Sequence, residues 1–229
     1  SYRMVEKNGS LVREEISPQL RALNGLYITD MMKRDNVVWI TTNHGLYRFD
    51  PYLQQLIVYR NLSHEFLSSL ALTSDNRLLV GSLYGVNVYD DATDSFSVWN
   101  TASNPPLKSD FVHCLLMDKG LIWVGTESGG IAKLVPRQLL LQNYVHTSSP
   151  ASISPNPVNA MYVEPDGTLW VGTVEGGLNR KESGDRSQEF VHLTKENSAL
   201  SHNSVSALVA DGKGRLWTGT WGGGLNVVE

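Results

Sequence analysis

The segment from Thr168 to Asn179, TLWVGTVEGGLN, is the most informative part of the sequence about the fold because its pattern recurs along the chain. Four other segments align with its first nine residues without a gap: VVWITTNHG at 37–45, RLLVGSLYG at 77–85, LIWVGTESG at 121–129 and RLWTGTWGG at 215–223. The third residue of the five segments is Trp39, Leu79, Trp123, Trp170 and Trp217, at spacings of 40, 44, 47 and 47 residues. Such periods indicate a repeat architecture.

The first four repeats each contain four short apolar runs separated by turn residues, and the last contains three. The first run has the form Ile28-x-x-Met31, Leu67-x-x-Leu70, Val112-x-x-Leu115, Val158-x-x-Met161 or Val205-x-x-Leu208. A turn such as Pro165-Asp166-Gly167 leads into the tryptophan segment, and two further runs follow it. The runs are rich in β-branched and aromatic residues, as expected of strands. Four-stranded units of roughly 40–50 residues predict an all-β protein, the β-propeller, with about five blades.

We expect a single β-propeller segment over 1–229, because a blade is stable only when stacked on its neighbours. The predicted blades are approximately 23–61, 62–106, 107–152, 153–199 and an incomplete 200–229, after a partial blade at 1–22. Two interpretations of these incomplete blades at the chain ends are open. One is a closed five-bladed ring in which an N-terminal strand completes the last blade. The other, which we favour, is a segment of a larger propeller of the seven-bladed type.

Glycines recur at two places in the repeat. Within the second strand lie Gly81, Gly125, Gly172 and Gly219, where close approach of a neighbouring strand or blade would require them; the first repeat has Thr41. The second group lies where the second strand reverses into the third, at 129–130, 176–177, 223–224, Gly45 and Gly85. A tight hairpin there needs positive φ. Neither a helix nor a lysine follows, so these glycines do not form a phosphate-binding loop.

Composition and charge exclude several classes of protein. The formal net charge is −4, and the absence of any Lys/Arg run predicts no nucleic-acid partner. Cys114 is the only cysteine, so no intrachain disulfide is possible, and we expect it to be a small buried apolar residue. The sequence has no apolar run of about 18 residues, so we expect no membrane contact by this segment itself.

The pattern L-S-x-N-x-V followed by D-x-x-G-x-L-W-V-G-T-x-x-G-G-L-N resembles the two-component regulator propeller repeat. Val158 to Asn179 and Val205 to Asn226 match it closely, and Val112 to Leu134 matches well. The two earlier repeats depart from it at Thr41 and Leu79. The resemblance covers nearly the whole chain, from Leu23 to Glu229.

This resemblance implies the extracytoplasmic sensor region of a bacterial hybrid two-component sensor histidine kinase, of the type found in Bacteroidetes. The implied location is periplasmic, as part of an inner-membrane sensor. The implied role is to detect a carbohydrate or glycan fragment and signal to a kinase elsewhere in the full chain. The implied partners are an oligosaccharide and the remaining blades and domains of the same sensor. A second copy, in a homodimer, is a further candidate partner if the blades serve as a scaffold.

The residues themselves indicate no catalytic chemistry. No two of the six histidines (His44, His64, His113, His146, His192, His202) have the spacing of metal ligands, and no nucleophile elbow occurs. Asp118, Glu164 and Asp211 occupy one repeat position before the first turn, where we expect them to accept hydrogen bonds from turn amides. We therefore expect no catalytic residue, no metal and no cofactor.

A binding site is predicted at one end of the blades. If the first strand lines the central channel, the loops leading into the blades and the hairpins after the tryptophan segments reach the same face. The candidate ligand-binding residues there are Trp221, Tyr84, His44, Asn43, Glu127, Glu175, His64 and His202. Trp221 and Tyr84 do not repeat, whereas Asn156 and Asn203 do and are expected to cap the incoming turn.

Three functions remain open on this reading. The first is sensing of a carbohydrate at the loop face. The second is a protein–protein interaction or dimerisation scaffold without small-molecule binding. The third is a propeller enzyme such as a lyase, which convergent carboxylates or a Tyr/His pair would support.

Overall fold

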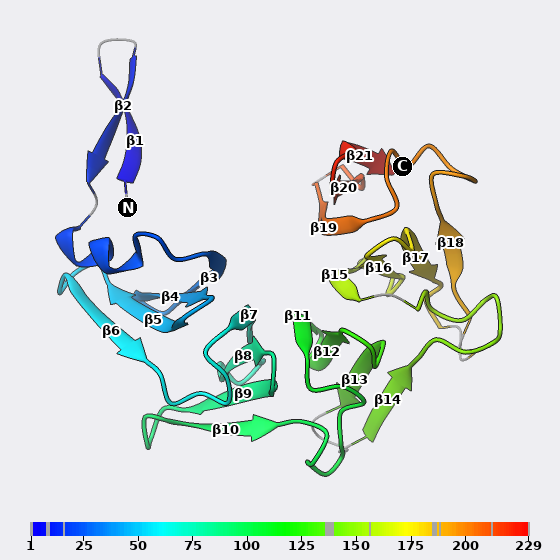
Figure 1. Cartoon of the computed structure of the whole chain (residues 1–229), viewed down its shortest axis with the longest axis horizontal. Coiled ribbons are helices and arrows are strands. Elements are labelled where there is room, and N and C mark those ends of the chain that lie inside the picture. The colour runs from blue at the N-terminus through cyan, green and yellow to red at the C-terminus, as the bar shows by residue number, and fades with distance from the viewer. Residues whose placement is uncertain are drawn as a thin grey trace.

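The computed structural model describes residues 2–7, 10–15, 17–135, 140–155, 157–184, 187, 189–211 and 213–228. Five antiparallel sheets follow one another along the chain, and we name them blade 1 to blade 5. The all-β propeller architecture predicted from the repeat is confirmed. Figure 1 shows the blades side by side in an open arc, with their first strands on the inside.

The strands of each blade are hydrogen-bonded in chain order. Blade 1 contains β3 (Ile28–Arg34), β4 (Val37–Thr42), β5 (Gly45–Asp50) and β6 (Gln55–Tyr59), and blade 2 contains β7 (Leu67–Leu72), β8 (Leu78–Ser82), β9 (Gly85–Asp90) and β10 (Ser95–Trp99). Blade 3 contains β11 (Val112–Asp118), β12 (Leu121–Thr126), β13 (Ile131–Val135) and β14 (Leu140–Tyr144), and blade 4 contains β15 (Val158–Val163), β16 (Leu169–Thr173), β17 (Leu178–Lys181) and β18 (Val191–Leu193). Blade 5 contains β19 (Val205–Ala210), β20 (Leu216–Thr220) and β21 (Gly224–Val228).

The N-terminal residues precede blade 1. β1 (Tyr2–Lys7) and β2 (Ser10–Glu15) pair with each other as a separate two-stranded sheet, and the short 3-10 helix η1 (Pro18–Leu23) follows. Figure 1 shows β1 and β2 projecting away from the arc of blades. In the described part of the chain, neither strand adds to a blade, and no helix is both long and apolar enough to cross a membrane.

Neighbouring blades pack through the repeat position that the tryptophans occupy. Trp39 belongs to the cluster between blades 1 and 2, Leu79 to that between blades 2 and 3, Trp123 to that between blades 3 and 4, and Trp170 to that between blades 4 and 5. All four side chains are buried. Burial of a large apolar side chain stabilises the folded state by about 1.5–3 kcal/mol, so these contacts hold consecutive blades together.

The glycines inside the second strands lie against the next blade. A Cβ on Gly125 would lie 2.6 Å from Val158 Cγ1, and one on Gly81 would lie 3.0 Å from Val112 Cγ1. Val205 crowds Gly172 in the same way. Close approach of a neighbouring blade, expected from the sequence, is confirmed at these three positions. At Gly219 the nearest atom is Ala207 Cβ of the same blade, at 3.4 Å.

Every first strand carries a β-bulge that the apolar pattern did not reveal. The register with the second strand shifts after the first residue of each pairing, so that one residue has no partner opposite. These residues are Thr29, Ser68, His113, Asn159 and Ser206. A bulge re-aims a side chain and bends the strand, so the inner strand of each blade presents one non-repeating, mostly polar residue.

The two flanks of the arc expose apolar side chains that the inner interfaces bury. Leu225 of blade 5 is 64% exposed, whereas its repeat equivalents Leu46, Val86, Ile131 and Leu178 are fully buried. Ile28 of blade 1 is 46% exposed, whereas Leu67, Val112, Val158 and Val205 at the same repeat position are fully buried. Each flank therefore has the chemical character of a blade interface.

Candidate functional site

The hairpin between the second and third strands contacts the loop that leads into the next blade. Gly45 N donates to Glu65 O at 2.7 Å, Gly85 N to Asp110 O at 2.7 Å, and Gly177 N to Asn203 O at 2.8 Å. Because these bonds recur at three of the four interfaces between blades, hairpins and incoming loops form a surface at the same end of the arc. We call this surface the loop face.

The first pair of candidates on the loop face joins blades 1 and 2. His44 Nδ1 lies 2.8 Å from Glu65 Oε2, and about half of each side chain is exposed. Beside it, Asn43 accepts a hydrogen bond from Tyr27 N on its Oδ1 at 2.9 Å, while Asn43 N donates to Tyr27 O at 3.0 Å. The asparagine therefore fixes the hairpin, whereas His44 and Glu65 offer a polar pair to solvent.

Blade 3 places three residues together that the sequence did not group. His113, the bulge residue of β11, pairs through Nε2 with Glu127 Oε2 in the hairpin of the same blade. Phe111 stacks on the imidazole with ring centroids 4.7 Å apart and an interplanar angle of 15°. We predicted only Glu127 of this cluster. The bulge that turns His113 toward it has no signature in the alternation of apolar residues, because a register shift depends on pairing between strands.

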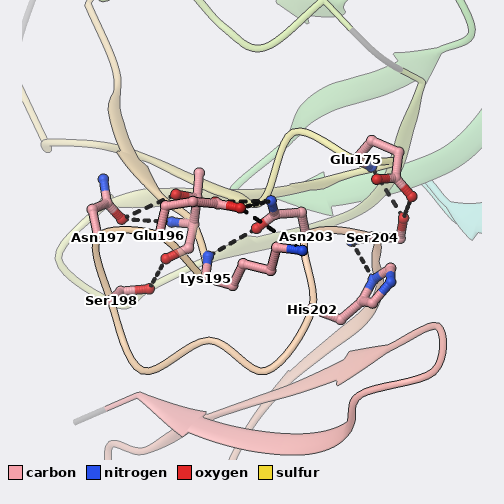
Figure 2. Close-up of polar contacts among 9 residues, drawn as sticks. Glu175, Lys195, Glu196, Asn197, Ser198, His202, Asn203 and Ser204 are labelled. Carbon is pink, nitrogen blue, oxygen red and sulfur yellow. Dashed lines mark hydrogen bonds and ion pairs between the residues drawn. The ribbon is translucent and has the colours of Figure 1, made fainter.

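Candidates from blades 4 and 5 meet at Ser204, as Figure 2 shows. Ser204 Oγ donates to Glu175 Oε1 at 2.7 Å and accepts from Glu175 N at 3.1 Å. His202 Nδ1 accepts from Ser204 N at 3.0 Å. His64 has the same role in the loop before blade 2, where its Nδ1 accepts from Phe66 N at 2.9 Å. In both rings this leaves the proton of the neutral form on Nε2.

Asn203 holds the incoming loop of blade 5 in shape, as expected (Figure 2). Its Oδ1 accepts from Lys195 N at 2.8 Å, and its Nδ2 donates to Glu196 Oε2 at 3.0 Å. This hydrogen bond from Asn203 is the main reason that the pKa of Glu196 lies below its usual range. Asn156, for which we expected the same role, lies outside the described residues.

The two non-repeating aromatic candidates are both exposed on hairpins of the loop face. Tyr84 in blade 2 is 51% exposed and Trp221 in blade 5 is 62% exposed. The backbone holds each in place: Tyr84 N donates to Ser82 Oγ at 3.1 Å, and Trp221 N donates to Ser204 O at 2.9 Å. Their rings are therefore available to a ligand while their main chains are fixed.

The acidic residues before the first turn do not all act as we expected. Asp211 accepts from the amides of Lys213 and Arg215, as predicted, but also from Trp217 Nε1 at 3.1 Å. The bond from Trp217 is the largest cause that holds the pKa of Asp211 well below its usual range. Glu164 accepts from Trp170 Nε1 at 2.7 Å. Asp118 lies five rather than six residues before its tryptophan, at the end of β11 opposite Leu121.

Two grooves between blades lie at the opposite end of the strands, near the turns that join first and second strands. The larger, about 930 Å3, lies between blades 2 and 3, and the smaller, about 420 Å3, lies between blades 4 and 5. None of the eight candidates on the loop face lines either groove. The loop face therefore presents its polar and aromatic groups independently of these two hollows.

A comparison with protein families finds one match within the chain. Residues 152–175 and 199–222 match the family described as "Two component regulator propeller". These segments overlap the two repeats that resemble its pattern most closely. No curated protein sequence matches the chain.

Solved structures with the same architecture include two from B. thetaiotaomicron. The extracellular domain of the hybrid two component system BT4673 has a TM-score of 0.72 at 22% identity, over 88% of this chain and 27% of that one. The extracellular domain of the hybrid two component system BT3049 has a TM-score of 0.62 at 20% identity, over 96% of this chain and 36% of that one. The chain thus spans about a quarter to a third of the length of these structures.

An enzyme also has this architecture. Virginiamycin B lyase from Staphylococcus aureus has a TM-score of 0.66 at 10% identity, over 96% of this chain and 74% of that one. At such identities the similarity concerns the fold alone, because propellers host unrelated functions. The function has to be argued from the loop face.

Proposed function

Since the chain contains two component regulator propeller repeats, we propose that it is a ligand-sensing part of the extracytoplasmic region of a hybrid two-component sensor. The ligand we propose is a carbohydrate bound at the loop face, and the location we propose is the periplasm. The kinase that receives the signal would lie elsewhere in the full protein, and this segment would perform no chemistry itself.

The observation that carries this proposal is the composition of the loop face. Tyr84 and Trp221 expose aromatic rings on fixed hairpins. Carboxylates lie on the same face at Glu65, Glu127 and Glu175. Aromatic rings present apolar surface to the C–H face of a sugar, and carboxylates accept hydrogen bonds from its hydroxyl groups. A rigid blade scaffold that positions non-repeating loops is a common basis for recognition.

Isothermal calorimetry of the full sensor region against a panel of oligosaccharides tests this proposal. We expect one class of glycan to bind, and we expect Trp221→Ala or Tyr84→Ala to weaken it by roughly tenfold, as loss of an aromatic anchor does. Tyr52→Ala is the matched control, because Tyr52 is 80% exposed in the turn between β5 and β6, away from the loop face.

Two outcomes would contradict the proposal. The first is no heat of binding from any oligosaccharide. The second is an equal loss of affinity in the Tyr52 control. The first result would favour the scaffold function, which the exposed apolar flanks support: Val209 is 61% and Leu225 is 64% exposed on blade 5. The second would mean that the two loop-face aromatic residues do not form the sugar site.

A further inference from the structure

The groove between blades 2 and 3 lies where blade 2 has two smaller side chains at positions that carry large ones in blades 1, 3 and 4. In blades 1, 3 and 4 the anchoring tryptophan carries a cation from the third strand over its ring: Arg48 over Trp39 at 5.9 Å, Lys133 over Trp123 at 4.8 Å and Arg180 over Trp170 at 5.4 Å. In blade 2 the same cross-strand pair is Leu79 and Val88. Both residues line the groove.

The groove between blades 4 and 5 is an internal control for this comparison. It lies at the same place in the repeat, since Trp170, Arg180 and Glu164 line it where Leu79, Val88 and Thr73 line the other. Its volume is about 420 Å3, against about 930 Å3 between blades 2 and 3. Both values lie within the range of roughly 300–1,000 Å3 typical of small-molecule sites, so it is the difference between them that reflects the two smaller side chains of blade 2.

The walls of the larger groove suit a flat aromatic group. They are mainly apolar, with Leu79, Val88, Ile122 and Leu134 among them. Trp99 of β10 also lines the groove, and its indole is held by a hydrogen bond from Nε1 to Pro105 O at 2.7 Å. A fixed aromatic wall beside the place that an indole ring fills in other blades favours a planar ring over a branched or polar group.

The rim of the groove favours a negative charge on that group. Arg77 and Asp75 neutralise each other through a bond of 2.7 Å, whereas the Lys119 ammonium has a neutral acceptor, Pro165 O in the β15–β16 turn of blade 4, at 3.0 Å and must turn from it to meet an anion in the groove. Thr73 stands where blade 4 has the carboxylate of Glu164. The rim thus has one more cation than the carboxylates that line it can balance.

We propose that the groove between blades 2 and 3 binds a small aromatic carboxylate, with its ring against Leu79, Val88 and Trp99 and its carboxylate near Lys119. The ring takes the place of the missing tryptophan. This site lies at the opposite end of the blades from the loop face, so it does not rest on the carbohydrate proposal.

Calorimetry of the full chain with indole-3-carboxylate and with neutral indole tests the site. We expect both to bind, the acid more tightly. Leu79→Trp restores the side chain of the other blades, and we expect it to abolish binding of both while circular dichroism shows a folded protein. Val88→Arg, which refills the other half of the space, serves if Leu79→Trp does not fold.

Lys119→Gln tests the role of the positive charge at the rim. Lys213→Gln is its matched control, because each lysine directly precedes the glycine (Gly120 or Gly214) of the turn between the first and second strands of its own blade. We expect Lys119→Gln to weaken the acid by about threefold, the size of an exposed ion pair, and to leave indole unchanged. Lys213→Gln should change neither. Failure of the native chain to bind either compound, native affinity in folded Leu79→Trp, or an equal effect of the two lysine variants would overturn the proposal.

Discussion

At the residue level, the positions that repeat and the positions that do not have different neighbours. The tryptophans of blades 1, 3 and 4 contact the next blade. Trp170 and Trp217 also donate to a carboxylate six residues earlier. The non-repeating side chains of Tyr84 and Trp221 contact solvent on the loop face. Repetition therefore marks packing, and departures from it mark the places available for binding.

Cys114 illustrates how one residue depends on a blade interface. Its Sγ lies against Gly125 and is 3.5 Å from Val158 O of the next blade. Although the residue is only half-buried overall, burial of the thiol raises its pKa from 9.0 to about 12. The sulfur is thus a neutral, packed group at physiological pH, although the residue as a whole is less buried than we expected.

We therefore predict that a thiol-specific disulfide reagent modifies Cys114 slowly in the native chain at pH 8 and rapidly after denaturation, because the thiolate is the reactive form. Absorbance of the thiol released from the reagent measures the rate of modification. Equal rates in native and denatured chains would show that the interface is not closed over the sulfur.

The raised pKa of Cys114 also makes stability depend on pH. Because the folded-state pKa is raised, the stability that this thiol contributes is complete below pH 9. It is lost as the pH rises from 9.0 toward about 12.

At the level of single elements, the two hairpin glycines have different tasks. The second glycine of each pair has positive φ: Gly130 at 65°, Gly177 at 77° and Gly224 at 74°. The first glycine does not, but a Cβ there would collide with the incoming loop, as at Gly129, where Lys108 Cβ would lie 2.8 Å away. The prediction of positive φ is confirmed for the second glycine, while close approach explains the first.

Gly177→Ala and Gly184→Ala separate backbone strain from crowding. Both glycines have φ near 75°, at 77° and 75°. A Cβ on Gly177 would collide with Leu193 O, whereas one on Gly184 has nothing within 4 Å. We expect Gly184→Ala to cost about 1–2 kcal/mol of unfolding free energy from the conformation alone. Gly177→Ala should cost at least about 1 kcal/mol more through the clash. Urea denaturation measures both, and equal losses would contradict the role of crowding.

At the level of the whole molecule, the repeat builds an interface that depends on the next blade being present. At three interfaces, the glycine in the second strand of one blade contacts a valine in the first strand of the next blade. In blade 5 the same glycine has no such neighbour among the described residues, and Leu225, opposite it in β21, is 64% exposed. The same sequence motif therefore has different energetic consequences inside the arc and on its flank.

Gly172→Ala and Gly219→Ala measure this difference with the same substitution at one repeat position. In blade 4 the new methyl group would collide with Val205, and we expect a loss of about 1–3 kcal/mol from overpacking. In blade 5 it would meet Ala207 Cβ at an ordinary 3.4 Å, and we expect a change within about 0.5 kcal/mol. Thermal unfolding followed by circular dichroism gives both values. A large loss at Gly219 would mean that this flank is covered in solution.

The blades, their strands and the side chains that pack them could be predicted from the amino-acid sequence alone. These follow from period, alternation and turn residues, which are local properties of the chain. It also placed Trp221, Tyr84 and Glu175 on hairpins, because the hairpin glycines are visible in the pattern. Local signals were sufficient here because each blade is built from consecutive residues.

How separate blades combine could not be predicted from the sequence and is visible only in the folded protein. The contact of Glu175 with Ser204, the cluster of His113 with Glu127 and Phe111, and the groove at Leu79 all depend on register shifts or on packing between blades. The sequence shows that Leu79 replaces a tryptophan, but not whether neighbouring side chains fill the space. Whether that space is filled depends on three-dimensional packing, because the residues around a smaller side chain move into the vacated volume only as far as their own contacts allow.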